Sequence, residues 1–272
     1  LIAQLNAVHW MAVANDKVAT KRHLEEAGVP TPRTLLSAES EHELDHRRAA
    51  LDVPGGFALK PAGGSQGEGI MLFSGSTHDQ FHLLNGETWS YEELRAHVRD
   101  ITRGLYSASD DRDRALFEEL IVPDEFSRSI APAGIPDFRV LIVRGKAVAA
   151  MLRVPTARSG GKANLHQGAA GFAVDIASGR IAGGTHEGSV TNVHPDSGEV
   201  LTGREVPRWQ DVLRVACAAQ RAVPLGYAGV DVCLDQRRGP VVIEINSRPG
   251  IEIQNALQKG LMPELELALA GS

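Results

Sequence analysis

The chain has 272 residues, 43% of them hydrophobic and 23% charged, and its formal net charge is −6. A chain of this size and composition buries a substantial core, as ordinary soluble globular proteins do. No apolar run is long enough for a transmembrane helix, no secretory signal is visible, and the negative charge argues against a broad nucleic-acid-binding face. The only two cysteines, Cys217 and Cys233, do not indicate a disulfide framework. We therefore expect a cytoplasmic protein without membrane or nucleic-acid partners, and a homo-oligomer is left open.

A first helix is predicted from Lys17 to Ala27, because Asn15 and Asp16 cap its start and Gly28 ends it. The prolines that follow force an extended exit from this helix. Residues 1–14 precede it as an N-terminal remnant or extension.

A charged helix is predicted next, over residues 37–51, and it contains the run His42-Glu43-Leu44-Asp45-His46. This run matches the HExxH helix of metalloproteases, in which two histidines bind Zn²⁺ and the glutamate is the general base. Its charged neighbours indicate an exposed helix, and no third ligand follows at short spacing. A zinc hydrolase is therefore a remote alternative.

A glycine-rich loop, residues 62–69, lies between two short predicted strands, Phe57 to Pro61 and Ile70 to Phe73. Glycine lets backbone NH groups approach an anion closely, and Lys60 on the first strand adds a positive charge beside the loop. The pattern favours a phosphate site over an ordinary glycine-rich hairpin. The loop residues concerned are Gly64, Ser65, Gln66 and Gly67.

Residues 74–113 are polar and predicted to be mostly helical, with the best helix over residues 90–104. A strand over residues 115–122 then leads into a loop at Pro123. A hairpin is predicted over residues 136–154. A three-residue turn there would set Arg153 opposite Asp137 on one face with Arg139, whereas a two-residue turn would break that grouping.

The loop over residues 160–169 is dense in polar donors, among them Lys162 and Asn164. Its histidine, His166, is a candidate general base, although most of the ten histidines must be bystanders. An amphipathic helix is predicted over residues 207–223.

The stretch Tyr227 to Gly250 reads as two strands rich in β-branched residues, joined by a polar turn. A turn centred between Arg237 and Arg238 sets Asp231 opposite Glu244, and the period of two puts Asn246 on the same side. Val241, Ile243 and Ile245 are then expected to face the core.

Two carboxylates and an amide without a thiolate or imidazole suit a hard cation. We therefore predict a nucleotide-bound Mg²⁺, with Mn²⁺ as an alternative, held by Asp231, Glu244 and Asn246.

The Gly-Val-Asp strand and the run from Glu244 to Gly250, EINSRPG, resemble the magnesium-binding end of the ATP-grasp superfamily of carboxylate ligases. The Asp-Phe-Arg strand, the Ala-Met-x-Arg strand and the Asn-Leu-His-x-Gly loop are similar to the RimK-type and α-L-glutamate ligase-like proteins. The resemblance implies an α+β ATP-grasp fold, in which two lobes with antiparallel sheets clamp ATP. Residues 15–114 would form the N-terminal lobe, with the phosphate loop and a helical insertion, and residues 115–272 the C-terminal lobe, with the metal and substrate site.

The resemblance also implies roles for single residues. The nucleotide would be contacted by Lys17, Lys60, Lys162 and the glycine loop. The backbone at Glu118 and Ile121 would bind the adenine, and Glu125 would bind the ribose. Phosphate and substrate would be bound by Arg139, Arg153, Asn164 and Arg248.

The function implied is an ATP-dependent carboxylate–amine ligase that works through an acyl phosphate on a small-molecule or peptide carboxylate and amine. A nucleotide-binding regulator without ligase activity is the alternative.

Overall fold

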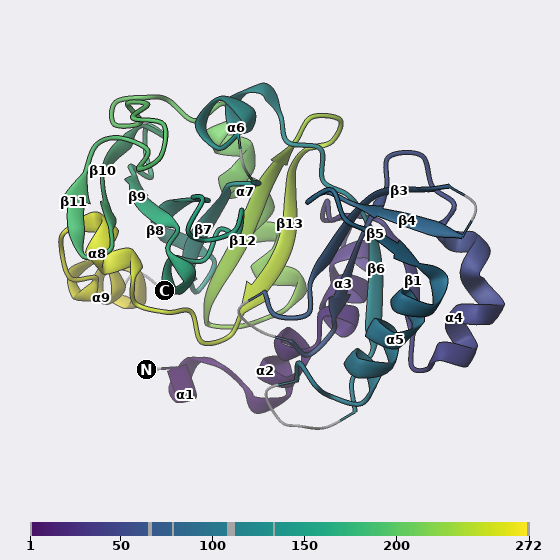
Figure 1. Cartoon of the computed structure of the whole chain (residues 1–272). Helices are drawn as coiled ribbons and strands as arrows, with labels where there is room; N and C mark the ends of the chain where they lie inside the picture. Colours follow the sequence, from purple (N-terminus) through teal and green to yellow (C-terminus); the bar gives the residue numbers. More distant parts are fainter. Residues whose placement is uncertain (1, 65–66, 78, 108–111, 133, 271–272) are drawn as a thin grey trace. The chain divides into compact units, whose positions relative to one another are not determined.

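The structure, a computed structural model, describes residues 2–64, 67–77, 79–107, 112–132 and 134–270, and the chain forms two compact units (Figure 1). Residues 1–15, 19–31 and 122–272 make the larger unit, and residues 16–18 and 32–121 make the smaller one. Ser65 and Gln66 lie outside the described residues. None of the helices in the described ranges is both long and apolar enough to cross a membrane. The expected domain boundaries after residues 14 and 114 stay a prediction.

The smaller unit is built on an antiparallel six-stranded sheet in the order β1-β6-β2-β3-β4-β5. Its core is aromatic and includes the stacked pair Phe57 and Phe73, whose ring centroids lie 4.7 Å apart. The elements are β1 (Thr34–Ala38), α4 (Glu41–Arg47), η1 (Arg48–Leu51), β2 (Phe57–Pro61), β3 (Met71–Thr77), β4 (Gln80–Leu83), β5 (Thr88–Ser90), α5 (Tyr91–Thr102) and β6 (Ala115–Glu119).

Helix α5 lies where residues 90–104 predict a helix, and its capping explains why. The Ser90 side chain accepts a hydrogen bond from the Glu93 backbone NH, and the Glu93 carboxylate accepts one from the Ser90 NH. The expectation that residues 74–113 are mostly helical is wrong before that point. Strand β4 alternates buried and more exposed side chains, with Phe81 and Leu83 in the core, but four residues are too few to signal a strand.

The larger unit contains an antiparallel seven-stranded sheet in the order β11-β10-β9-β8-β7-β12-β13. Its strands are β7 (Asp137–Val143), β8 (Lys146–Val154), β9 (Ala170–Val174), β10 (Ile181–His186), β11 (Ser189–Thr191), β12 (Tyr227–Asp235) and β13 (Gly239–Asn246). Its helical elements are α1 (Ile2–Leu5), α2 (Val8–Asn15), most of α3 (Lys17–Glu26), α6 (Glu125–Ile130), η2 (Leu165–Gln167), α7 (Trp209–Ala222), α8 (Ile253–Leu257) and α9 (Met262–Ala270).

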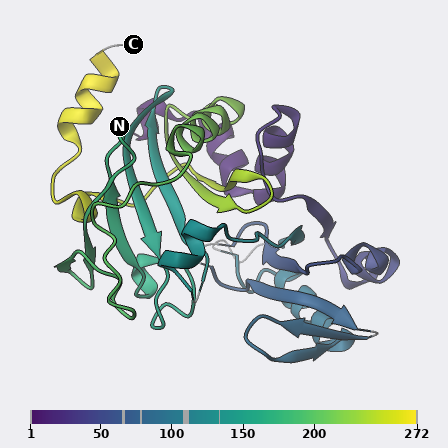
Figure 2. The same cartoon turned by 90° about the horizontal axis from the view of Figure 1, so that it is seen from above.

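Helices cover both faces of this sheet (Figure 2). On one face, α7 packs against β12 and β13, and its buried residues Val212, Ala216 and Ala219 join the main core. On the other face, α8 and α9 cover apolar residues of β7 and β8, such as Leu141 and Met151. We call this second face the site face, because Arg139 and Arg153, two positions away along the same strands, also point to it.

Two β-bulges fix the side-chain register on the site face. The turn between β7 and β8 has two residues, since Val143 pairs with Lys146, but a bulge at Val148 restores the pairing of Asp137 with Arg153. The grouping that was expected only for a three-residue turn therefore occurs with a two-residue turn, because the bulge compensates for the shorter turn.

The β12–β13 hairpin behaves in the same way. Asp235 pairs with Gly239, so the turn is centred on Arg237 and the expected centre between Arg237 and Arg238 is wrong. A bulge at Ile243 makes up the difference and brings Asp231 opposite Glu244 as predicted. Because of this bulge, Val242 and Ile245 face the main core. Val241 is buried as expected, although outside that core cluster, whereas Ile243 is only partly buried and the expectation for it is wrong.

Candidate active site

Four charged side chains from β7, β8 and β12 form a connected cluster on the site face: Asp137, Arg139, Arg153 and Asp231. Arg139 donates from Nε and Nη2 to the two carboxylate oxygens of Asp231, at 2.8 and 2.7 Å. Arg153 donates to both oxygens of Asp137 at 2.6 Å, and its Nη2 also reaches Asp231 Oδ2 at 2.7 Å. Sequence reasoning named both arginines and Asp231 as site residues, and the structure brings them together.

Burial sets the electrostatics of this cluster. Desolvation raises the pKa of Asp137 to about 6, because it outweighs the attraction of Arg153. Burial alone would also raise the pKa of Asp231, but the two arginines outweigh it and hold that pKa below its ordinary value. The two carboxylates balance the charge of the two guanidinium groups, so the cluster has no large net charge. The hydrogen bonds between these groups hold the charges in fixed positions.

Glu244 and Asn246 extend the cluster along β13. Glu244 is the direct pairing partner of Asp231, and Asn246 Nδ2 lies 3.4 Å from Asp231 Oδ2. The predicted metal-binding residues are thus neighbours, and the carboxylate and amide oxygens of Glu244 and Asn246 fit a hard cation. Asp231 fits less well, because both of its oxygens already accept hydrogen bonds from arginine. The assignment of all three to one metal ion stays a prediction.

The polar loop over residues 160–169 contains η2 and lies over the site face. A Cβ atom added to Gly171 on β9 would lie 3.0 Å from Leu165 of this loop, and Gly171 is the pairing partner of Arg153. The Asn164 side chain accepts a hydrogen bond from the His166 backbone NH, so it caps the turn. Lys162 is exposed four residues before His166.

The segment after β13 is fixed by a residue that sequence reasoning missed. Asn6 is buried and its side chain bonds the Tyr227 NH and the carbonyl groups of Tyr227 and Ser247. It therefore ties the start of β12 to the end of β13. Arg248 follows Ser247 and is exposed. A buried asparagine far away in sequence gives no recognisable signal before the fold is known.

In the smaller unit, the two predicted phosphate-binding lysines both have partners. Lys60 on β2 forms an ion pair with Glu118 on the neighbouring strand β6, and both side chains are largely buried. Lys17 donates to the carbonyl oxygen of Gly64 at the start of the glycine loop. Lys17 therefore lies at the glycine loop, as the predicted phosphate contact requires, while the contact itself is untested.

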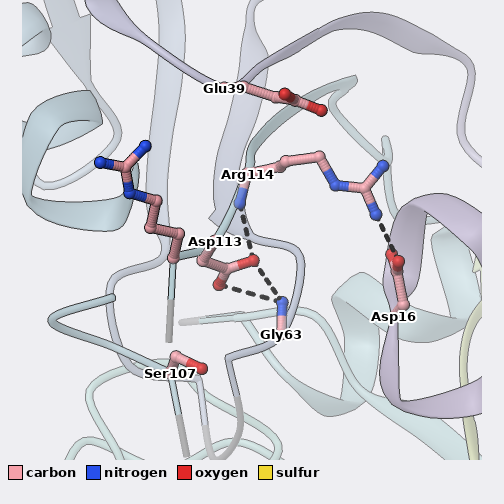
Figure 3. A pocket seen from close by; sticks show the side chains of 7 residues that line it. Asp16, Glu39, Gly63, Ser107, Asp113 and Arg114 are labelled. Carbon is pink, nitrogen blue, oxygen red and sulfur yellow. Dashed lines mark hydrogen bonds and ion pairs between the residues drawn. The ribbon is translucent and has the colours of Figure 1, made fainter. Parts of the chain in front are cut away.

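A pocket of about 490 Å³ lies beside the start of the glycine loop (Figure 3). Asp113 holds the loop here, since its two carboxylate oxygens accept hydrogen bonds from the Gly63 NH at 2.9 and 3.0 Å. Arg114 is ion-paired with Asp16 across the pocket. The lining carries three carboxylates and two guanidinium groups, which disfavours a triphosphate inside it. The lining residues are Asp16, Glu39, Gly63, Ser107, Arg112, Asp113 and Arg114.

The predicted adenine contacts belong to the smaller unit, and the predicted ribose contact belongs to the larger one. Glu118 is buried on β6, Ile121 follows this strand, and Glu125 is in the first turn of α6. A second residue that sequence reasoning missed is Asp235, whose buried carboxylate accepts a hydrogen bond from the Val122 NH at 3.0 Å. Asp235 thereby anchors the segment that directly follows the predicted adenine contact.

The HExxH run lies on α4, and the structure gives it no metal site. Its imidazole rings are 4.1 Å apart, but Glu43 accepts a hydrogen bond from the Glu39 NH instead of facing a cleft. Within the described residues, no group of three or more His, Cys, Asp or Glu side chains is placed to hold a metal ion. The expectation of an exposed helix is met, and the zinc hydrolase gains no support.

The family model for sugar-transfer associated ATP-grasp proteins matches residues 1–268. The chain belongs to the sugar-transfer associated ATP-grasp family. This match confirms the ATP-grasp resemblance seen in the sequence, and the ATP-grasp fold implies ATP binding.

Three comparisons support the ATP-grasp assignment. A probable alpha-L-glutamate ligase of Maridesulfovibrio salexigens is 27% identical over 242 residues, which cover 88% of this chain and 57% of that protein. The ribosomal protein bS6–L-glutamate ligase of Escherichia coli is 28% identical over 251 residues, covering 91% and 60%. The structure of the ATP-grasp ligase PsnB with a precursor variant, Mg and ADP has a TM-score of 0.51 at 16% identity, covering 98% and 61%.

These comparisons show the fold and the glutamate ligase resemblance. The ATP-grasp chain spans about 57% to 60% of the length of the two curated relatives. The structural match at 16% identity shows the fold alone.

Proposed function

We propose that this ATP-grasp protein is an ADP-forming carboxylate–amine ligase. A carboxylate is too stabilised for direct attack by an amine, so it is first phosphorylated by ATP, and the amine then displaces phosphate from the acyl phosphate. The observation that carries the proposal is the cluster of Arg139, Arg153 and Asp231 beside Glu244 and Asn246 on the site face.

The arginines supply what phosphoryl transfer needs most, which is fixed positive charge where negative charge develops. Because Asp137 binds Arg153 through both oxygens, the guanidinium plane is held before any ligand arrives. Glu244 and Asn246, with Asp231 as the third predicted ligand, would hold a Mg²⁺ or Mn²⁺ ion. The metal ion, when bound, would offset the negative charge of the phosphates.

The second set of contacts is proposed for the smaller unit. Lys60 and Lys17 would bind phosphate oxygens, with backbone NH groups of the glycine loop beside them. The backbone at Glu118 and Ile121 is proposed to bind adenine, and Glu125 the ribose.

The substrates are proposed to be an amino acid and a peptide or protein carboxylate. One relative is named for its action on ribosomal protein bS6 with L-glutamate, and PsnB was captured with a precursor. Lys162, Asn164 and Arg248 are proposed to contact substrate or phosphate. Arg248 is exposed and lies two residues after Asn246, the last residue of β13.

The test is a screen of amino acids and dipeptides in pairs, with ATP and Mg²⁺, for phosphate release. We expect ADP, phosphate and an amide detected by mass spectrometry, only when both a carboxylate and an amine are present. Formation of AMP and pyrophosphate would contradict the acyl-phosphate route. Magnesium-dependent ATP binding without turnover across the whole screen would instead favour the nucleotide-binding regulator.

A further inference from the structure

His166 and Glu252 form a side-chain pair on the larger unit, with His166 Nε2 3.2 Å from Glu252 Oε1. We propose that His166 is the general base that removes a proton from the attacking amine, and that Glu252 orients its ring. This inference rests on the ligase function proposed above. It adds a residue pair for the second half-reaction, in which the amine attacks the acyl phosphate.

The loop that carries His166 packs on the strand position beside Arg153. Leu165, the neighbour of His166, covers Gly171 on β9, and Gly171 pairs directly with Arg153 on β8. Leu165 also packs with the apolar residues under α8 and α9 on the site face. His166 itself is 67% exposed at its side chain, so a substrate can reach it.

The backbone that carries His166 is held from several directions. Asn164 accepts hydrogen bonds from the NH groups of His166, Gln167 and Ala169. Gly168 closes the turn with a φ of 101°, a conformation that favours glycine, and its carbonyl oxygen accepts hydrogen bonds from Thr156 Oγ1 at 2.8 Å and His186 Nε2 at 3.1 Å. A base held in this way needs little reorganisation during the reaction.

The backbone position of Glu252 is also fixed by packing. Glu252 directly precedes α8, and the α8 residues Ile253 and Ala256 are buried against the sheet. This packing holds the backbone of Glu252 in place. A Cβ atom on Gly250 would lie 2.2 Å from Glu252 Oε2, so a larger residue at position 250 would displace the carboxylate from this position.

The pair defines which nitrogen acts as the base. Neutral His166 donates its Nε2 hydrogen to Glu252, so the lone pair is on Nδ1. Other charged groups near the loop are Arg158, which is ion-paired with Glu187, and the exposed Lys162. Of the described acidic groups, Glu252 is the one that contacts the His166 ring.

The chemistry balances as follows. Nδ1 takes one proton from the substrate ammonium group, and the freed lone pair forms the N–C bond at the acyl carbon. The C–O bond to phosphate breaks, and its electron pair leaves with the phosphate. The second nitrogen proton goes to the phosphate, which departs as hydrogen phosphate, and His166 returns its proton to water.

The experiment separates the two half-reactions by the choice of nucleophile. Hydroxylamine is unprotonated at neutral pH and traps the acyl phosphate as a hydroxamate without a base, whereas the α-amino group of L-glutamate must first lose a proton. The dipeptide Glu-Glu serves as carboxylate, with ATP and Mg²⁺. For His166→Gln we expect amide formation to fall by about 10²- to 10⁴-fold at pH 7 while hydroxamate formation changes by less than about twofold. The amide rate should recover as the pH rises above the pKa of the amine.

Controls make the outcomes distinct. His46→Gln, an exposed histidine of the smaller unit, should leave both products unchanged. Glu252→Gln and Gly250→Ala should lower only amide formation, by less than His166→Gln does. If His166→Gln lowers hydroxamate and amide equally, or lowers neither, His166 is not the base. If the wild-type protein forms no hydroxamate with any carboxylate of the screen described above, the ligase function itself fails.

Discussion

Asp113 is a single residue that we expect to control nucleotide affinity without touching the nucleotide. Its carboxylate holds the Gly63 NH with both oxygens, which fixes where the glycine loop begins. Replacing it by Asn removes the charge from this contact, and loss of such a charge-assisted bond costs roughly 1 to 3 kcal/mol. We expect ATP affinity in Asp113→Asn to fall by about tenfold, measured by calorimetry. Asp175→Asn, which alters a similar carboxylate–backbone contact in the larger unit, should leave the affinity unchanged.

Asn6 gives a second prediction at this scale, on stability. Its buried amide makes three hydrogen bonds to the ends of β12 and β13, and their loss leaves backbone groups unsatisfied. Asn6→Ala should therefore lower the free energy of unfolding by about 2 to 4 kcal/mol in urea titrations, since two or more buried groups lose their partner. Asn85→Ala, at an exposed turn, is the matched control. An equal effect of both substitutions would contradict the role given to Asn6.

Single residues also mark the limit of sequence reasoning. The pairing of Asp231 with Glu244 was predicted from a turn centred between Arg237 and Arg238, whereas the turn is centred on Arg237 and the bulge at Ile243 makes up the difference. The pairing therefore depends on a bulge that strand alternation does not signal. Asn6, Asp113 and Asp235 were not predictable, since each bonds a backbone group 50 or more residues away and leaves no periodic pattern.

At the scale of elements, the salt-bridged strands β7, β8 and β12 predict a pH dependence. Asp137 has a pKa raised to about 6, so the folded chain binds its proton more tightly than the unfolded chain does. Between about pH 4 and pH 6 the folded state then holds more protons, and this carboxyl makes stability fall as the pH rises. In Asp137→Asn this part of the slope should disappear from urea unfolding measured across that interval. Asp79→Asn, an exposed ion-pair partner, should keep the wild-type slope.

The elements themselves were predictable where their patterns are long. Helix α7 and both hairpins follow from amphipathic or alternating runs, and the bounds agree closely. Strands β4 and β5 and helix α9 were not predicted from the sequence, because each is short or weakly amphipathic and depends on the rest of the fold for its burial. In β5, for example, Trp89 is positioned by its contact with Phe73 of the aromatic core.

For the whole molecule, ligand binding should appear as a gain in stability, because a ligand that binds only the folded state stabilises it. At a hundredfold excess over the dissociation constant, ATP with Mg²⁺ should add about 2.7 kcal/mol to the free energy of unfolding. Lys60→Met should remove most of this gain at the same ATP concentration, since it removes the proposed phosphate contact. Lys146→Met, in the larger unit, should keep it. The same gain in Lys60→Met as in the wild type would remove Lys60 from the proposed site.

The bulges at Val148 and Ile243 have a consequence for comparing this chain with its relatives. Each bulge lies between a hairpin turn and the charged cluster. Its one extra residue shifts the alternation of side chains, so the length of the turn does not by itself decide which side chains of the strand face the site. A relative could lose a bulge and gain a turn residue, or the reverse, and still present the same carboxylates and guanidinium groups. An alignment that places its gap in the turn would then shift Asp231, Glu244 or Arg153 by one position and report a substitution that never occurred. Relatives should therefore be matched outward from the cluster, with length differences assigned to the bulges first.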